Sequence, residues 1–219
     1  MYLKLDIRLV VFDVDGTLTK HSSVWWRLHE HFDTTVKGKL YYDQYFAGEI
    51  SYEEWADLDA GLWKGRTLEE VMEVVKATQL TPGSIETIQT LKDYGLRTAI
   101  LSGGLDIMAN DIGRRVGIDY VLTNRLHHQD GILTGKVDNL VAWGGKTKAL
   151  HLINKHFEIP LEKTAFVGDG RNDMSVFKVV GLSIAYNPED QEVADAANVV
   201  ILEDDLRVIL PHVISEFPQ

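Results

Sequence analysis

The feature that most constrains this chain is a short apolar run, Leu9–Phe12, which ends directly in two acidic residues, Asp13 and Asp15. An unbroken apolar run of this length is typical of a strand that is buried on both faces of a sheet. The glycine and threonine that follow are turn residues. The sequence therefore predicts a buried strand at residues 8–13, with two carboxylates at the point where it ends.

Strand-like and helix-like segments alternate over most of the chain. Residues 97–101 and 164–168 are predicted strands with apolar centres, and Lys146–Phe157 is a predicted amphipathic helix. Asp130 and Gly131 separate two short runs and predict a hairpin within residues 126–137. This alternation indicates a doubly wound parallel α/β sheet. The remaining predicted helices are residues 81–94, 105–116, 172–180 and 206–214, and the remaining predicted strands are residues 120–123, 182–185 and 199–202.

Residues 22–78 interrupt the alternation. They show helical periodicity without a clear strand, and they contain ten of the twenty aromatic residues of the chain. A segment of this length between two strands is too long for a loop. We therefore expect a small helical cap, residues 21–78, inserted after the first strand of a Rossmann-like core made of residues 1–20 and 79–219.

Composition narrows the possible partners. The chain has no cysteine, which excludes disulfides, thiolate catalysis and cysteine-ligated metals. Its formal net charge of −11 argues against a nucleic acid or an anionic membrane, because both require a basic surface. No apolar run is long enough to span a membrane, and the N-terminus has no secretory pattern, so the expected location is the cytoplasm.

Polar residues follow three of the predicted strands. Asp13 and Asp15 follow the first, Ser102 follows the second, and Asp169 follows the strand at residues 164–168. In an open parallel sheet, ligands bind outside the carboxyl ends of the strands. A carboxylate there can attack phosphorus or transfer a proton, paired carboxylates can hold Mg²⁺, and Lys146 would balance the charge of a phosphoryl group. The glycines after Ser102 are expected at a helix N-terminus, where amides bind phosphate oxygens.

Four stretches resemble the signature motifs of the haloacid-dehalogenase (HAD) superfamily of phosphatases. They are DVDGTLT at residues 13–19, SGG at residues 102–104, Lys146, and GDGRND at residues 168–173. Longer matches at residues 101–107, 124–135 and 168–177 are similar to the phosphoserine-phosphatase branch. The resemblance implies a Rossmann-like core with an inserted helical cap, a Mg²⁺ cofactor and a small phosphorylated metabolite as substrate.

The resemblance also implies roles for individual residues. Asp13 would be the nucleophile and Asp15 the general acid and base. Mg²⁺ would be bound by Asp13, the backbone carbonyl of Asp15 and Asp169, with Asp173 supporting the metal through water or lysine contact. The residues implied to hold the phosphoryl group are Ser102, Gly103, Lys146 and Asn172.

The cap departs from this branch at the positions that would bind phosphoserine. Ser22 stands where the branch has an acidic residue for the substrate amine, and Asp59 aligns with the arginine that clamps the substrate carboxylate. An aspartate would repel that carboxylate, so we expect phosphoserine to be a poor substrate. Aromatic residues including Trp25 and Tyr52 could instead cover the site, form the cap's own core, or provide a homodimer face.

Three alternatives stay open at this point. The chain could be a phosphoserine phosphatase proper, or a phosphotransferase on the same fold, since only the acceptor differs. A receiver-like regulatory module also clusters acids and a lysine at strand ends. Such a module needs no cap, and it has no use for an acid such as Asp15 two residues after the phosphorylated aspartate. These features favour an enzyme over the regulatory module.

Overall fold

A seven-stranded sheet forms the centre of the computed structural model, which describes residues 6–20 and 23–214. The strand order is β4-β3-β2-β1-β5-β6-β7, and all neighbouring strands are parallel except the β3–β4 pair. The doubly wound α/β fold predicted from the sequence is confirmed. The strands are β1 (Leu9–Phe12), β2 (Arg97–Leu105), β3 (Tyr120–Gln129), β4 (Ile132–Asp138), β5 (Thr164–Gly168), β6 (Leu182–Tyr186) and β7 (Val199–Ile201).

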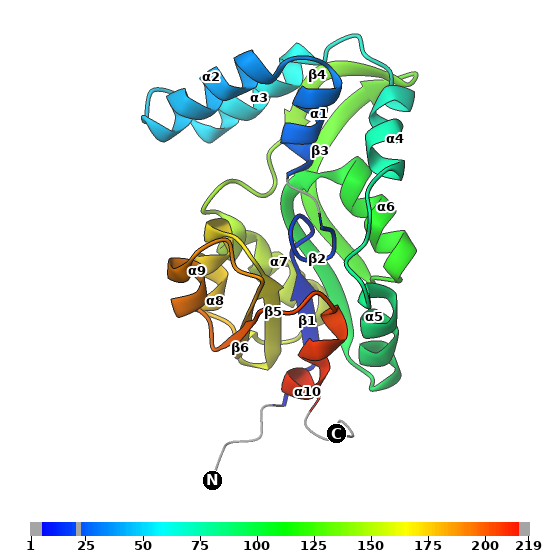
Figure 1. The fold of residues 1–219 in the computed structure, drawn as a ribbon, viewed down its shortest axis with the longest axis vertical. Helices are drawn as coiled ribbons and strands as arrows, with labels where there is room; N and C mark the ends of the chain where they lie inside the picture. The colour runs from blue at the N-terminus through cyan, green and yellow to red at the C-terminus, as the bar shows by residue number, and fades with distance from the viewer. Residues whose placement is uncertain (1–5, 21–22, 215–219) are drawn as a thin grey trace.

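Helices cover both faces of the sheet (Figure 1). Along β1, Val10 and Phe12 belong to one buried apolar cluster, whereas Leu9 and Val11 belong to another. This alternation places β1 between two apolar layers, as its unbroken apolar sequence predicts. The first layer includes α5 (Ser84–Asp93) and α6 (Asp106–Val116), and the second includes α7 (Lys146–Phe157), α8 (Met174–Phe177) and α9 (Gln191–Asp195).

Some predicted boundaries differ from the structure. β2 continues four residues beyond its predicted end at Leu101, because Leu105 pairs with Asn124 of β3 after an irregularity in the register. The single helix predicted at residues 172–180 is a 3₁₀ turn followed by the short α8. The final helix is likewise divided into a 3₁₀ turn, η3 (Leu206–Ile209), and α10 (Leu210–Val213), and α9 has no counterpart in the prediction.

Between β1 and α5, the described residues form four helices. They are α1 (Val24–His31), α2 (Thr35–Phe46), α3 (Tyr52–Leu62) and α4 (Leu68–Lys76). The helices α3 and α4 each begin with a capping box, in which Ser51 or Thr67 and a glutamate three residues later satisfy exposed backbone amides. Figure 1 shows α2 and α3 side by side above the carboxyl edge of the sheet, and α4 beside α6.

The inserted helices share their buried apolar cluster with the sheet. Leu28 of α1 and Val71 of α4 lie in the same cluster as Val10 of β1 and Met108 of α6. The helical insertion itself is observed, but its definition as a separate cap domain of residues 21–78 stays a prediction. None of the helices in residues 6–20 and 23–214 has the length and hydropathy needed to cross a membrane.

Candidate active site

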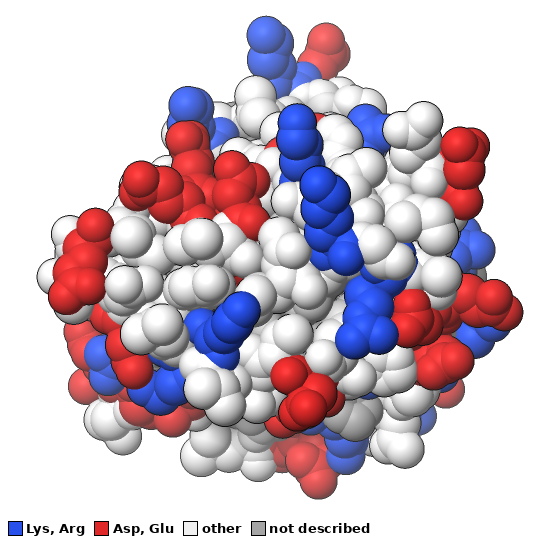
Figure 2. All heavy atoms as spheres, turned by 90° about the horizontal axis from the view of Figure 1, so that it is seen from above, with Lys and Arg blue, Asp and Glu red and all other residues white. Residues whose placement is uncertain are grey.

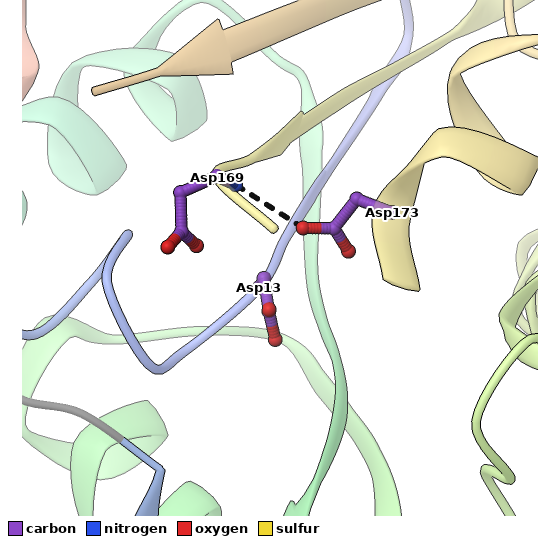
Figure 3. A group of neighbouring side chains, drawn as sticks. All are labelled: Asp13, Asp169 and Asp173. Carbon is purple, nitrogen blue, oxygen red and sulfur yellow. Dashed lines mark hydrogen bonds between the residues drawn. The ribbon is translucent and has the colours of Figure 1, made fainter. Parts of the chain in front are cut away.

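Three carboxylates meet where β1 and β5 end (Figure 3). Asp13 follows β1 and Asp169 follows β5, and these strands are direct neighbours in the sheet. Asp173 comes from the turn after β5, and its Oδ2 accepts hydrogen bonds of 3.1 Å from the amides of Asp169 and Gly170. One carboxylate oxygen from each aspartate lies within 4.8 Å of the others. The predicted convergence of these side chains at the carboxyl edge is therefore observed.

Lys146 is the buried counter-charge of this cluster. Its side chain is 1% exposed, and its Nζ lies 2.9 Å from Asp13 Oδ2 and 2.6 Å from Asp173 Oδ1. Burial opposes the charged form of the ammonium, but the neighbouring charges of Asp13 and Asp173 prevail and raise the pKa of Lys146 above its ordinary value. The lysine therefore stays cationic beside the carboxylates.

Among the three carboxylates of the cluster, Asp169 has the most strongly disfavoured ionised form. Its Oδ1 accepts a hydrogen bond of 3.1 Å from the hydroxyl of Thr17. Burial, followed by the charges of Asp13 and Asp173, raises the pKa of Asp169 to about 9. Burial similarly raises the pKa of Asp173 to about 6. Three carboxylates facing one ammonium form an oxygen-rich, electron-rich donor set that suits a divalent cation such as Mg²⁺.

Asp15 points to the same cavity from the turn after β1. Gly16 makes this turn with a φ of +82°, and a Cβ there would overlap the carboxylate of Asp169. Asp15 Oδ2 accepts a long hydrogen bond, 3.4 Å, from the amide of Val24 in α1. Desolvation by the surrounding atoms and the charge of Asp13 raise the pKa of Asp15 to about 7. A carboxyl group with this pKa can both donate and accept a proton near neutral pH.

The Ser102-Gly103-Gly104 segment corrects one expectation. It belongs to β2 and does not begin a helix, because β2 runs to Leu105 and α6 starts at Asp106. The hydroxyl of Ser102 accepts a hydrogen bond of 3.0 Å from the amide of Gly104. The helix thus begins one residue later than predicted, and the glycines before it are part of the strand. Ser102 and Gly103 line the cavity, and phosphate binding by these amides stays a prediction.

The aspartates, Lys146 and the inserted helices enclose a cavity of about 530 Å³. This volume lies within the range of small-molecule sites, about 300–1,000 Å³. Most of the site residues predicted from the sequence line this cavity. They are Asp13, Asp15, Trp25, Tyr52, Asp59, Ser102, Gly103, Lys146, Asp169 and Asn172, the last from the turn after β5.

The predicted cap residues have different surroundings. Ser22 lies outside the described residues. Trp25 donates a hydrogen bond of 3.0 Å to the carbonyl of Gly103, and the Tyr52 hydroxyl accepts one of 3.1 Å from Asn124. Burial raises the pKa of Tyr52 to about 12, so its hydroxyl stays protonated. Both side chains are therefore anchored in the cavity wall.

Asp59 lies inside the insertion, and its Oδ1 is 3.2 Å from Nε2 of the equally buried His29. His29 is not among the residues predicted from the sequence, because it lies thirty positions from Asp59. Trp143 and Ala142, which line the cavity from the loop before α7, were not predicted either. No local pattern in the sequence distinguishes these residues.

Charges are mixed on the face seen from above in Figure 2. Acidic groups surround a short row of basic side chains, with uncharged surface between them.

Two expectations from the sequence stay predictions: that the protein binds no nucleic acid, and that it is located in the cytoplasm.

The fold and site define an α/β protein whose acidic, lysine-containing site lies at the carboxyl edge of the sheet beneath a helical insertion. The chain matches the family described as haloacid dehalogenase-like hydrolase over residues 10–178, and it belongs to that family. It is accordingly a phosphatase, a hydrolase of phosphoric monoesters, and the resemblance predicted from the sequence is confirmed.

Similar proteins carry a more specific name. The phosphoserine phosphatase of Methanocaldococcus jannaschii is 35% identical over 209 residues, which cover 94% of this chain and 97% of that protein. Phosphoserine phosphatase SerB2 of Mycobacterium tuberculosis is 34% identical over 87% of this chain and 47% of its own length. A solved phospho-aspartyl intermediate analogue of phosphoserine phosphatase has a TM-score of 0.79 at 34% identity, covering 95% of this chain and 99% of that one.

Proposed function

We propose that this protein hydrolyses a small phosphomonoester by way of an aspartyl-phosphate on Asp13, with Mg²⁺ as cofactor. The single observation that carries the proposal is the position of Asp13. Its Oδ1 accepts a hydrogen bond of 2.8 Å from the amide of Val14, and its Oδ2 contacts Lys146. The carboxylate is thus held in one orientation at the floor of the cavity, which is what a nucleophile requires.

The chemistry divides between the two aspartates after β1. Asp13 would attack phosphorus and form a covalent phosphoryl intermediate, while Asp15 would donate its proton to the leaving oxygen. Asp15, then ionised, would accept a proton from the water that attacks the phosphoryl group and restores Asp13. The pKa of Asp15, about 7, supports both steps near neutral pH.

The remaining residues would bind and orient the phosphoryl group. Lys146 would offset its negative charge, and Ser102, Gly103 and Asn172 would supply neighbouring polar contacts. Asp13, Asp169 and the backbone carbonyl of Asp15 would hold Mg²⁺. Mg²⁺ held by these residues would supply positive charge that offsets the negative charge of the phosphoryl group and of the carboxylates. Asp173, which bonds to Lys146 and to the turn after β5, would keep this arrangement rigid.

We further propose that phosphoserine is not the preferred substrate. Two relatives are named phosphoserine phosphatases, which supports the alternative that it is. Against this, the Lys and Arg side chains among the described cavity-lining residues are Lys20, Lys146 and Arg171, and none of them lies on α1, α2 or α3. At the aligned position, Asp59 offers a carboxylate where a substrate carboxylate would need a cation. A homodimer and phosphotransfer to an acceptor other than water stay open.

An assay with a generic aryl phosphate tests the reaction. Turnover should require Mg²⁺, disappear on chelation, and return when Mg²⁺ is added back. A panel of phosphorylated metabolites then tests the substrate. A kcat/KM for phosphoserine far above every other phosphomonoester would reject the claim about specificity while leaving the reaction class intact.

A further inference from the structure

A second polar group lies in the same cavity, on the side of the inserted helices. His29 comes from α1, and Trp55 and Asp59 come from α3. All three line the cavity that also contains Asp13 and Asp15. The side chains of His29 and Asp59 are 3% and 4% exposed. The proposed mechanism uses none of these three residues.

Three polar atoms of this group are poorly satisfied within the described part of the chain. His29 Nε2 and Asp59 Oδ1 are 3.2 Å apart, but their alignment does not make a well-formed hydrogen bond, and Trp55 Nε1 makes none of good geometry either. Both side chains still interact with Asp59 and favour its ionised form. Buried polar groups are normally hydrogen-bonded, and unsatisfied ones at a cavity wall are suited to bind a ligand.

The imidazole of His29 is fixed in place by its neighbours. Thr34 Oγ lies 2.8 Å from His29 Nδ1, and the Thr34 hydroxyl donates a hydrogen bond of 3.5 Å to the carbonyl of His29. The same oxygen accepts a hydrogen bond from Trp63 Nε1 at 3.3 Å. The acidic group on this side of the cavity is therefore the Asp59 carboxylate, held beside an oriented imidazole ring.

Aromatic rings surround this charge. The rings that line the cavity are those of Trp25, Trp26, His29, Tyr42, Tyr52, Trp55 and Trp143. An aromatic wall with one carboxylate and no facing Lys or Arg side chain attracts a cationic group, both through the ring faces and through the opposite charge. It disfavours a second carboxylate on the ligand. Burial raises the pKa of Asp59, and an adjacent ligand cation would hold that carboxylate ionised.

The other cations that line the cavity do not alter this balance. Arg171 is engaged by three carboxylates, with its Nε 2.7 Å from Asp190 Oδ2 and 3.8 Å from Glu189 Oε1, and its Nη1 3.3 Å from Glu192 Oε2. Lys20 precedes α1 and is exposed. None of the cavity-lining Lys and Arg side chains of the described residues lies on α1, α2 or α3, whereas Asp59 lies on α3.

We propose that the His29–Asp59 pair binds a cationic nitrogen of the substrate, so that the physiological substrate is an aminoalkyl or ammonioalkyl phosphate without a carboxylate. The phosphate would lie at Asp13 and Lys146, and the cation would lie between Asp59 and the aromatic wall. This inference rests on the proposed phosphatase reaction for the position of the phosphate. It adds a recognition site at the opposite side of the same cavity.

The first test compares matched substrates on the wild-type protein. One series carries a terminal ammonium on alkyl phosphates of increasing length, and a second replaces the ammonium with methyl. The best ammonium compound should exceed its methyl counterpart in kcat/KM by roughly tenfold or more, as a partly desolvated cation–aromatic and charge contact would give. A trimethylammonium member distinguishes a quaternary cation from a primary amine.

A third series replaces the ammonium with hydroxyl, because the Trp55 Nε1–H, which makes no hydrogen bond of good geometry within the described residues, would also suit a ligand oxygen. A preference for hydroxyl over ammonium, or equal rates for ammonium and methyl, would overturn the proposal. Hydrolysis of an aryl phosphate with no advantage for the ammonium would leave the phosphatase reaction standing and reject only this inference.

The second test uses Asp59→Asn, with Asp57→Asn as its matched control. Asp57 lies on the same helix but is exposed. Asp59→Asn should bring the kcat/KM ratio of ammonium over methyl compounds close to one, whatever its effect on absolute turnover, and Asp57→Asn should preserve that ratio. Calorimetric binding of an aminoalkyl phosphonate, which cannot be hydrolysed, gives a readout independent of turnover. Equal binding by the wild type of phosphonates with and without the ammonium would contradict the inference even if no phosphate were hydrolysed.

Discussion

The ammonium of Lys146 lies 2.9 Å from the carboxylate of Asp13, and both side chains are almost fully buried. The same ammonium contacts Asp173 at 2.6 Å, so one cation serves two carboxylates. Without it, the floor of the cavity would hold uncompensated negative charge in a place where water cannot screen it. The lysine is therefore expected to have both a structural and a functional role.

Lys146→Met removes the positive charge but keeps most of the side-chain volume. Its effect therefore reports on the loss of the charge and not on an empty space. Breaking a buried ion pair from one side costs about 3–5 kcal/mol, because the remaining charge is left unpaired. We expect urea unfolding to show a loss of this size, together with loss of phosphatase turnover. Adding Asp173→Asn to Lys146→Met should restore part of the stability but not the turnover. An unchanged unfolding midpoint for Lys146→Met would contradict this role.

Asp13→Asn should abolish turnover of an aryl phosphate. The amide cannot form the covalent phosphoryl intermediate, and removing a nucleophile that acts with its neighbours typically costs roughly 10⁴-fold or more. Mass spectrometry of the quenched wild-type reaction should find a phosphoryl group on Asp13, and none in the variant. Retained turnover in Asp13→Asn, after deamidation has been excluded, would reject Asp13 as the nucleophile.

The pH dependence of kcat/KM should reflect the protonation of Asp15. Its pKa of about 7 means that the carboxyl group can protonate a leaving oxygen below this pH and loses that ability above it. For an alkyl phosphate, kcat/KM should therefore fall as pH rises through about 7, whereas an aryl phosphate, whose leaving group needs little protonation, should respond less. Asp15→Asn should lower alkyl turnover by roughly 10²–10⁴-fold and remove this pH step. The same step in both substrates would contradict the assignment.

The stability of the metal-free protein should fall as pH rises. Asp169 has a pKa of about 9 in the folded state against an ordinary value of 3.8, so the folded state binds the proton more tightly than the unfolded state. The contribution of Asp169 to the free energy of unfolding is therefore greatest below the pKa that this carboxyl has in the unfolded state. That contribution is lost as the pH rises toward the pKa of Asp169 in the folded state. Thermal unfolding between pH 5 and 9 without metal should show this loss.

Asp169→Asn is the control for this pH effect. It should flatten the pH dependence, and it should also remove the stabilisation that Mg²⁺ gives the wild-type protein. A wild-type protein whose stability is unaffected by Mg²⁺ at pH 8 would argue against a cation at this cluster.

Gly38 should be intolerant of a side chain. It packs on the imidazole of His29, and a Cβ at this position would lie 2.7 Å from His29 Nε2. We expect Gly38→Ala to destabilise the protein by about 1–3 kcal/mol, as overpacking does. Gly61 of α3 is the matched control, because nothing lies within 4 Å of a Cβ there, and Gly61→Ala should stabilise the helix by about 0.5–1 kcal/mol. Equal effects in urea unfolding would contradict the packing around His29.

The sequence predicts the strands best where the signal is local. β1, β5 and α7 match their expected positions closely, because apolar runs and turn residues define them without reference to distant segments. The end of β2 was misplaced because two glycines suggest a turn, whereas pairing with β3 extends the strand through them. The aspartates and Lys146 were found because each follows or begins such a local element.

The His29–Asp59 pair could not be predicted in the same way. It depends on how α1 and α3 pack, and the sequence contains no periodic signal that joins residues from two helices of an insertion. Asp59 was noticed only as a departure from a family pattern, and its partner appeared only in three dimensions.

The apolar cluster shared by α1, α4 and the sheet has a consequence for cooperativity. Because Leu28 of α1 and Val71 of α4 belong to the same buried cluster as Met108 of α6, unfolding either helix would expose apolar side chains of the core, and we expect the insertion and the core to unfold together. Calorimetric and van't Hoff enthalpies of unfolding should therefore agree. Movements that admit a ligand are expected to be confined to α2 and α3, with the remainder behaving as one thermodynamic unit.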